Sequence, residues 1–471
     1  MVAPPATSGE NRVWLRAWPG AWRGTRPGAS PGPWRVAWPQ VGLAAGVLLF
    51  AAAVTAHVAQ AVIHPQWYWQ QTDESVYRAA GAAVLGDHGV LYSLRLGSPR
   101  LPFTYPPFAA LLFASASRFS FFSWQLALTV ANVLALPAIA YVSLGLAGQR
   151  RGAARIAAAL ALAAASLWLE PVQKTLLFGQ LNLLLLALVL ADLAAPDTRR
   201  LKGAGIGIAA GIKLTPLIFI PYLLLTGRWR AALAGLVTFV ATVVLGLTLL
   251  PGDSKTYLGG GFAAPGDGPQ RLVNQSVNGL VQRALHGGTP APAVGLCLAA
   301  LIFAAGLATA AAASRQGKEL LGIVVCGVTG LLVSPISWTH HWVYVIPGLA
   351  LVAGKAPGFG PAAGTSGKRL AVAARLAVGA AVLGLFGMWP GRSGPNGYYD
   401  PRAAFVPRGF LRFAPHNFGL EYQWNGMELV VGNYYVLIGL ISVAATAVYL
   451  AVIRSQARPD RTDKASSTIC G

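Results

Sequence analysis

Long apolar segments recur along this chain of 471 residues and constrain its fold more than any other feature. A helix that crosses a bilayer needs about 20 mainly apolar residues. Ten segments reach or approach this length, near 41–62, 121–147, 153–170, 177–195, 231–250, 293–314, 319–334, 341–354, 370–389 and 433–454. Charged residues make up only 11% of the chain, against about 25% in a typical soluble domain. The sequence therefore predicts an all-α polytopic membrane protein and excludes a cytosolic enzyme and a disulfide scaffold.

The distribution of charge predicts the orientation of these spans. The chain has 36 Lys and Arg residues against 15 Asp and Glu, a net charge of +21. On one side, 23 of the basic and six of the acidic residues flank the spans, which leaves +17 there. The other side carries 12 basic and nine acidic residues, and Lys213 lies within the apolar zone. Because cytoplasmic flanks are rich in Lys and Arg, we expect a plasma-membrane protein with both termini in the cytoplasm, and no nucleic-acid partner.

The apolar segment 204–225 does not fit a simple crossing. Both of its flanks are basic, so a single crossing would invert every later loop. Pro216, near its middle, lacks a backbone donor and disfavours helix just before it. We predict a re-entrant pair of half-helices that enters and leaves on the cytoplasmic side, which raises the number of membrane helices to twelve. Such breaks are tolerated where protein covers them or where they line a cavity.

This threading divides the chain into three parts. Residues 1–40 form a basic cytoplasmic N-terminal arm, residues 41–454 the transmembrane domain, and residues 455–471 a disordered cytoplasmic tail. The outer loops are then 63–120, 251–292, 335–340 and 390–432. We expect function to reside mainly in these loops, because the rest of the chain is mostly apolar.

An acidic stretch opens the first outer loop. Asp73 follows the first span closely, so its carboxylate would lie at the membrane–water boundary, where it could take a proton from a hydroxyl group. Glu74 is a neighbouring competitor, and Tyr77 and Arg78 are candidate binding residues one turn further on. The alternative is structural, with Thr72 or Asp73 capping the helix that starts here.

Further polar residues lie near the predicted outer boundary. Tyr105 belongs to the proline-rich stretch Leu101–Phe108, which suits either a binding site or an interfacial aromatic belt. The amides of Gln180 and Asn182 could bind a sugar hydroxyl or join two helices.

A charge at membrane depth, such as that of Lys213, is a functional hypothesis by default. A phosphate or a buried acid would pair with it, and snorkelling to the surface is the alternative.

Two later loops carry polar clusters. Asn274, Gln275 and Asn278 have helical spacing and would either bind substrate or cap a helix. His340 and His341 follow in the short outer loop, and imidazole binds phosphate or metal. The sequence offers no spaced second cluster for a metal and no glycine-rich loop for a nucleotide. We therefore expect neither a metal nor another cofactor.

Together these motifs resemble glycosyltransferase family 87, polytopic actinobacterial enzymes of the GT-C architecture. The resemblance rests on markers in the family's order over about 70–341. They are Asp73 with Val76 and Tyr77, Thr104–Pro107, Gly179–Asn182, Lys213–Pro216, Asn274–Asn278 and Ser334–His341. It implies a polyprenyl-phosphate sugar donor, usually mannose, and transfer on the outer face of the plasma membrane. The implied acceptor is a glycolipid or glycan of the phosphatidylinositol mannoside or lipomannan type.

The resemblance also implies residue roles. The family's acid maps onto Asp73 as the catalytic base, and its late histidine maps onto His340 or His341. The acceptor oxygen would attack the anomeric carbon with inversion, and basic side chains would stabilise the leaving phosphate. Because the leaving group is already a monophosphate, this scheme needs no metal.

Three alternatives remain open at this point. Some members of the family transfer arabinofuranose, so these motifs do not fix the sugar. A lipid or solute transporter would explain the spans and Lys213, but it would predict matching broken helices in both halves, and the sequence has one such pair. A polymerase or ligase of cell-surface glycans would need a large outer loop but not the early acid.

Overall fold

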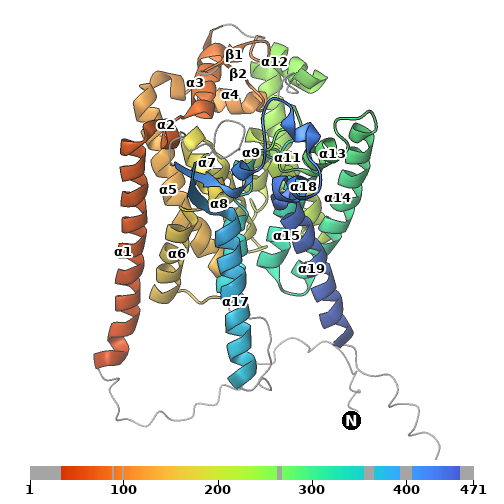
Figure 1. Cartoon of the computed structure of the whole chain (residues 1–471). Helices are drawn as coiled ribbons and strands as arrows, with labels where there is room; N and C mark the ends of the chain where they lie inside the picture. The colour runs from red at the N-terminus through yellow and green to blue at the C-terminus, as the bar shows by residue number, and fades with distance from the viewer. Residues whose placement is uncertain are drawn as a thin grey trace, which may run out of the picture.

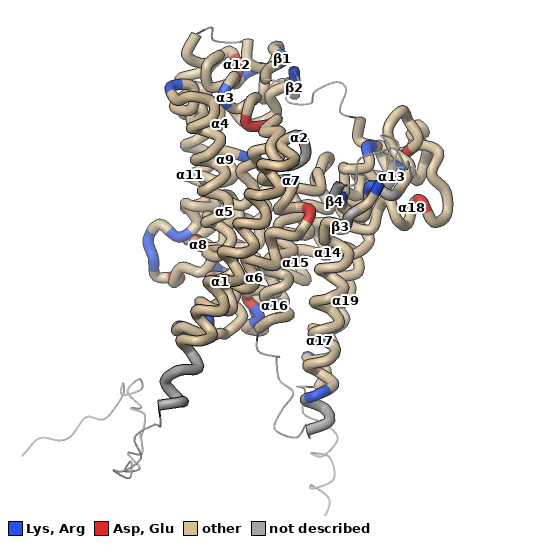
Figure 2. The backbone as a smooth tube through the Cα atoms, turned by 60° about the vertical axis from the view of Figure 1, so that its left-hand side comes forward, with Lys and Arg blue, Asp and Glu red and all other residues tan. Residues whose placement is uncertain are grey.

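Helices dominate the computed structural model, which describes residues 33–86, 90–97, 100–261, 268–354, 365–392 and 406–456. Within these ranges, six helices are long and apolar enough to cross a membrane. They are α1 (Pro33–Ile63), α5 (Phe121–Leu146), α11 (Trp229–Leu249), α14 (Ala291–Arg315), α17 (Thr365–Phe386) and α19 (Tyr434–Gln456). Figure 2 shows the long helices almost free of charge, with Lys and Arg gathered mainly in the connections. The prediction of a helical multi-pass membrane protein is confirmed.

The other four apolar segments form shorter helices. They are α6 (Ala153–Ser166), α8 (Asn182–Leu193), α15 (Glu319–Val333) and α16 (Val345–Ala353). A further helix, α7 (Glu170–Phe178), precedes α8 and meets it at a bend of 117°. The bend follows from Gly179, whose φ of 69° is left-handed, a conformation that glycine adopts at little cost. The prediction of one unbroken helix over 177–195 is therefore wrong at its start.

The segment 204–225 is broken, as predicted. Helix α9 (Ala204–Ile212) ends at Lys213, whose backbone is extended. A 3-10 turn, η2 (Thr215–Ile218), then leads into α10 (Phe219–Leu225). Gly235 of α11 lies against both Gly203, at the start of α9, and Ile220 of α10. Because α10 connects directly to the start of α11, both arms of the segment begin or end beside the same end of that helix.

Asp192 and Arg228 anchor the two arms. The Asp192 carboxylate accepts hydrogen bonds of 2.8 and 2.9 Å from the backbone N–H groups of Gly203 and Ile206, at the start of α9. After α10, the Arg228 guanidinium forms a salt bridge of 2.7 Å with Glu319. A carboxylate at a helix N-terminus accepts hydrogen bonds from the free N–H groups and interacts favourably with the helix dipole.

The connection from α1 to α5 folds into a separate small unit at one end of the molecule (Figure 1). It contains α2 (Pro65–Tyr68), α3 (Thr72–Leu85), β1 (Arg95–Leu96), β2 (Leu101–Pro102), α4 (Pro107–Phe113) and the 3-10 turn η1 (Ala116–Arg118). Val76, Tyr77, Phe103 and Phe113 belong to its own buried core. Helix α1 begins and α19 ends at the opposite end of the molecule.

Shorter elements from later parts of the chain connect the long helices and pack toward the same end as this unit. They are α12 (Pro251–Thr256), η3 (Tyr257–Gly261), α13 (Val277–Ala284), η4 (Thr339–His341), β3 (Met388–Gly391), β4 (Val406–Gly409), η5 (Phe410–Phe413), η6 (Leu420–Gln423) and α18 (Met427–Gly432). The Asp253 carboxylate accepts a 2.8 Å hydrogen bond from the backbone N–H of Leu91. The fully buried Arg283 donates to Asn433 and to backbone carbonyls. These contacts gather loops that are distant in sequence around one cavity.

Candidate active site

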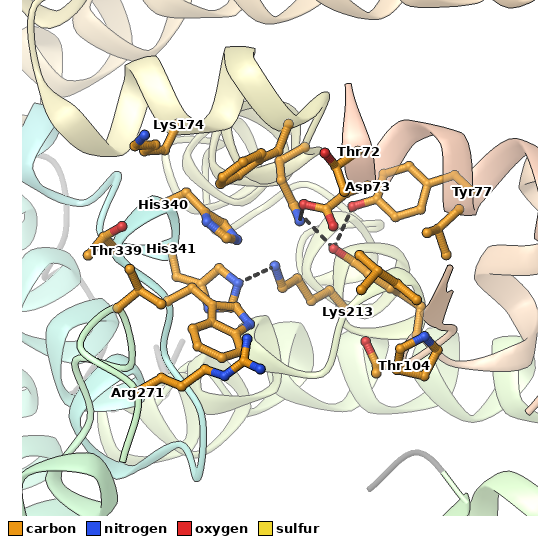
Figure 3. A pocket seen from close by; sticks show the side chains of 18 of the residues that line it. Thr72, Asp73, Tyr77, Thr104, Lys174, Lys213, Arg271, Thr339, His340 and His341 are labelled. Atoms are coloured by element: carbon orange, nitrogen blue, oxygen red, sulfur yellow. Dashed lines mark hydrogen bonds between the residues drawn. The ribbon is translucent and has the colours of Figure 1, made fainter. Parts of the chain in front are cut away.

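A cavity of about 400 Å³ lies where α3, the proline-rich stretch, α7, the break after α9 and η4 meet. It is lined by seven of the residues that the sequence singled out, namely Asp73, Tyr77, Tyr105, Gln180, Lys213, His340 and His341. Figure 3 shows Asp73 with Thr72 and Tyr77 on one side and the two histidines with Arg271 on the other. Residues as far apart in the sequence as Thr72 and Arg412 therefore meet in one pocket.

Asp73 is held at the end of a chain of polar side chains. Its Oδ2 accepts a hydrogen bond of 2.6 Å from Nε2 of Gln180. The hydroxyl of Tyr105 donates to Oε1 of the same amide at 2.9 Å and lies 2.7 Å from the Tyr77 hydroxyl. Because the amide cannot rotate without breaking both bonds, the carboxylate is fixed in orientation toward the pocket.

The start of α3 explains why Asp73 faces the cavity. The N-cap residue is Gln71, with a left-handed φ of 51°, and its own side chain makes no capping hydrogen bond. The backbone N–H and side-chain amide of Gln71 donate to the carbonyls of Leu177 and Leu176, at 2.7 and 2.8 Å. The suggestion that Thr72 or Asp73 caps this helix is wrong, because docking on α7 places the cap one residue earlier.

Glu74 lies beside Asp73 in sequence but in a different environment. Its side chain is fully buried, it does not line the cavity, and neither carboxylate oxygen has a hydrogen-bond partner among the described residues. Burial raises its pKa to about 8, against the opposing charge of Arg78. Because its carboxylate does not reach the cavity, Glu74 is a poor choice for a base compared with Asp73.

The opposite side of the cavity is basic. Nζ of Lys213 lies 2.9 Å from Nε2 of His341 and donates a 2.8 Å hydrogen bond to Oδ1 of Asn182. The rings of His340 and His341 meet edge to face, with 4.7 Å between their centroids. Nε2 of His340 and Nδ1 of His341 are buried and have no hydrogen-bond partner among the described residues. Two imidazoles and an ammonium group thus converge on one wall, which suits an anionic group.

Sequence reasoning missed several lining residues that carry charge. Lys174, Arg271 and Arg412 also line the cavity, so four cations face the single carboxylate of Asp73. Lys174 was detectable, since it is a basic residue inside an apolar stretch, and Arg271 stands just before the Asn274–Asn278 motif. Nothing in the sequence around Arg412 pointed to this cavity, because only the fold brings η5 to α7.

Five predicted binding residues do not line this cavity. Arg78 donates to the carbonyl of Phe119 at 3.1 Å. The Asn182 amide accepts a hydrogen bond from Lys213 and donates one to the carbonyl of His340. The other three amides, of Asn274, Gln275 and Asn278, bind the carbonyls of Pro269, Leu272, Pro335 and Gly432. Ser276 caps α13 by accepting from the N–H of Gly279. The three amides thus hold backbone carbonyls, and the residue that caps α13 is Ser276, none of the three.

An apolar cavity adjoins the polar one. It has a volume of about 230 Å³ and shares Pro106, Leu214 and Tyr257 with the main pocket. Its other lining residues are mainly apolar and lie on α4, α11 and η3, among them Phe108, Phe239, Val243, Leu247 and Leu258. The combined space suits a ligand with one polar and one apolar end.

Metal ions in proteins are commonly held by histidine, cysteine, aspartate and glutamate side chains. Among the described residues, no group of three or more such side chains is placed to hold a metal ion.

Comparisons with known proteins bear on the identity of this site. The sequence model of glycosyltransferase family 87 matches residues 103–335. A polyprenol-phosphate-mannose-dependent alpha-(1-2)-phosphatidylinositol pentamannoside mannosyltransferase of Mycobacterium tuberculosis is 37% identical over 312 residues, which cover 64% of this chain and 70% of the relative.

Two further relatives match at similar length. A polyprenol-phosphate-mannose-dependent alpha-(1-2)-phosphatidylinositol mannoside mannosyltransferase of M. tuberculosis is 31% identical over 335 residues, 68% of this chain and 76% of that protein. A protein of Mycolicibacterium smegmatis with the same name is 32% identical over 60% of this chain and 69% of its own length. No solved structure matches the chain. The resemblance in the sequence motifs is confirmed, and the chain belongs to glycosyltransferase family 87.

Proposed function

We propose that this protein transfers mannose from a polyprenyl-phosphate donor to a glycolipid of the phosphatidylinositol mannoside type, forming an alpha-1,2 linkage. The names of the relatives support the donor, the acceptor class and the linkage. The observation that carries the proposal is the pocket itself, in which one carboxylate faces a wall of two histidines and several cations. This pairing fits a reaction that removes a proton from one substrate and leaves a phosphate on the other.

Asp73 is the general base in this proposal. It accepts the proton of the acceptor hydroxyl while that oxygen attacks the anomeric carbon of the donor. The bond between this carbon and the phosphate oxygen breaks, its electron pair stays on the phosphate, and the anomeric configuration inverts. Gln180 keeps the carboxylate in line for proton transfer through its 2.6 Å hydrogen bond.

The basic wall receives the leaving phosphate. Lys213, Arg271, His340 and His341 are the groups proposed to hold it, and the two unpartnered imidazole nitrogens are available for this. Fixed donors that face developing charge lower the barrier because they need no rearrangement during the reaction. The lipid chain of the donor lies in the adjoining apolar cavity, which shares Pro106, Leu214 and Tyr257 with the pocket.

We also propose the membrane arrangement in full. Ten spans and the re-entrant pair over 204–225 give twelve membrane helices in a GT-C architecture. Both termini, including the arm at 1–40 and the tail at 455–471, are cytoplasmic, and the pocket opens on the outer face. Residues 1–32 and 457–471 lie outside the described residues. The excess of Lys and Arg in the flanks on one side supports this orientation, and so do the two arms of 204–225 that meet the same end of α11.

An amide in place of the carboxylate tests the reaction. Asp73→Asn keeps the shape of the side chain and removes the base, so we expect mannose transfer to fall by about 100-fold or more. The assay follows radiolabelled mannose from polyprenyl-phosphate-mannose into a phosphatidylinositol mannoside, with size-exclusion elution as the check of folding. Glu428→Gln is the control, since Glu428 lies outside the cavities described above. Near-normal transfer by Asp73→Asn would overturn the proposal, as would a wild-type protein that uses only an arabinofuranosyl donor.

A further inference from the structure

A second, smaller recess opens off the main pocket and has no part in the mechanism described above. It has a volume of about 150 Å³ and shares Lys174, Phe178 and Arg412 with the main pocket. Arg408 lines this recess only. The rest of the lining is mixed, with Tyr68, Gln70, Gln173 and Gly409 beside the apolar Leu177 and Met388.

The recess gathers positive charge. Lys174, Arg408 and Arg412 all line it, and no acidic residue does. Among the described residues, neither Lys174 nor Arg412 forms a salt bridge. The Glu170 carboxylate, which accepts a 3.0 Å hydrogen bond from Tyr435, acts on both of them, and the Glu421 carboxylate also acts on Arg412. Burial, together with the charge of Arg412, lowers the pKa of Arg408. The three cations lie together in one half-buried recess and repel one another, and an anion between them would relieve that repulsion.

The fold builds this recess from distant segments. Strands β3 and β4 pair, with Trp389 opposite Arg408. The hairpin is tied to the start of α7 by a bridge between Leu169 and Gly387 and by a 3.0 Å bond from the Met388 N–H to the Trp168 carbonyl. Gly409 lies directly against Glu170, where any side chain would collide with the carboxylate. The close approach that glycine permits therefore brings both arginines to Lys174.

The recess and the apolar cavity join the main pocket at different residues. The apolar cavity shares Pro106, Leu214 and Tyr257 with it, whereas the recess shares Lys174, Phe178 and Arg412. In the proposed function, the donor's phosphate is bonded to the reacting carbon and its lipid chain lies in the apolar cavity. A second anionic group beside the reacting sugars must then come from the other substrate.

We propose that Lys174, Arg408 and Arg412 form an anion subsite that holds the phosphodiester of the acceptor glycolipid. This inference rests on the proposed function, because it assigns the subsite to the acceptor of that reaction. Charge-assisted bonds from two guanidinium groups and an ammonium group suit a phosphate oxygen. The subsite orients the acceptor so that its sugar hydroxyl reaches Asp73, and it selects acidic acceptors over neutral ones.

Steady-state kinetics with two acceptors test the subsite. One acceptor is a phosphatidylinositol mannoside, and the other is a neutral alkyl mannoside with the same terminal sugars. Arg408→Gln is the main variant, because Arg408 does not line the main pocket. Loss of one charged hydrogen bond predicts a rise of about 10- to 100-fold in KM for the acidic acceptor. KM for the neutral acceptor, KM for the donor and kcat with the neutral acceptor should stay within about twofold.

Two variants serve as controls. Arg100→Gln removes an exposed guanidinium outside the three cavities, whose Nε donates a 3.4 Å hydrogen bond to the carbonyl of Arg95, and should change nothing. Arg408→Lys keeps the charge and should restore part of the affinity for the acidic acceptor. If Arg408→Gln does not fold, as judged by size-exclusion elution, Arg408→Met takes its place with the same expected preference.

The outcomes separate this inference from the proposed function. A wild-type protein that transfers mannose to neither acceptor would overturn the proposed function. A wild-type protein that uses both acceptors, with Arg408→Gln matching Arg100→Gln, would overturn the subsite alone. A parallel rise in KM for the neutral acceptor or for the donor would also overturn the subsite, because neither change depends on the acceptor's charge.

Discussion

Gln180 donates a 2.6 Å hydrogen bond to Asp73 across 107 residues of sequence, and this bond joins the small unit between α1 and α5 to the turn between α7 and α8. Asp73 comes from the first turn of α3, whereas Gln180 lies in the turn between α7 and α8. The left-handed Gly179 makes that turn possible. A backbone bend inside an apolar segment therefore decides the orientation of the proposed base.

We expect Gln180→Leu to lower kcat by about tenfold to 100-fold, because Asp73 then loses its fixed orientation. KM for the donor should change little. The measurement is mannose transfer at saturating substrate, and Gln423→Leu, at an exposed position in η6, is the matched control. Equal activity of the two variants would contradict a positioning role for Gln180.

Gln180→Glu should act differently from Gln180→Leu. A second carboxylate beside Asp73 raises the pKa of the pair, since two like charges in contact cannot both ionise easily. The acid limb of the pH–activity profile should therefore move to higher pH. An unchanged profile would show that Asp73 is not the group that must lose its proton.

The raised pKa of the buried Glu74 carboxyl predicts that the stability of the protein depends on pH. Its folded pKa of about 8 lies above the ordinary value of 4.5, so the folded state holds a proton that the unfolded state releases between these values. Stability from this group is present at low pH and is lost as the pH rises toward 8. Glu74→Gln mimics the protonated form and should avoid that loss. Its Tm in detergent should match the wild type near pH 4.5 and exceed it at pH 8, and a gap that narrows with rising pH would contradict this.

Lys213→Met should reduce transfer by about 100-fold, because it removes the ammonium group that contacts both His341 and Asn182 and a donor to the leaving phosphate. Lys213→Arg should recover part of the activity through its charge. Lys255→Met, at an exposed position on α12, is the control. Transfer by Lys213→Met at the level of this control would remove Lys213 from the phosphate site.

Gln275→Ala should weaken the fold without changing the chemistry. The buried amide of Gln275 donates to the carbonyls of Leu272 and Gly432, at 2.7 and 2.8 Å. Buried carbonyls left without donors cost about 1–3 kcal/mol. We expect a lower Tm, with KM for both substrates unchanged in the folded fraction. A selective rise in either KM at an unchanged Tm would return Gln275 to the list of binding residues.

Local signals in the sequence identified much of the site. Asp73 stands just after a span, Lys213 is a charge at membrane depth beside a proline, and the two histidines follow a proline-containing loop. Each is unusual against its neighbours, so each is visible without the fold. The amides of Asn274, Gln275 and Asn278 looked similar but bind backbone carbonyls. A polar side chain that binds substrate and one that hydrogen-bonds to the backbone of a loop have the same chemistry, and only their surroundings differ.

By itself, the sequence determined that this is a helical membrane protein with a broken segment at 204–225, and its motifs resembled the family to which the chain belongs. Those properties follow from the length of apolar segments, the placement of proline and the order of motifs, all of which are local. The tertiary structure decided the bend at Gly179, the burial of Glu74 and the meeting of Lys174 with Arg408 and Arg412. The burial of Glu74 and the meeting of Lys174 with the two arginines depend on contacts between segments more than 100 residues apart, and hydropathy along the chain carries no information about such contacts.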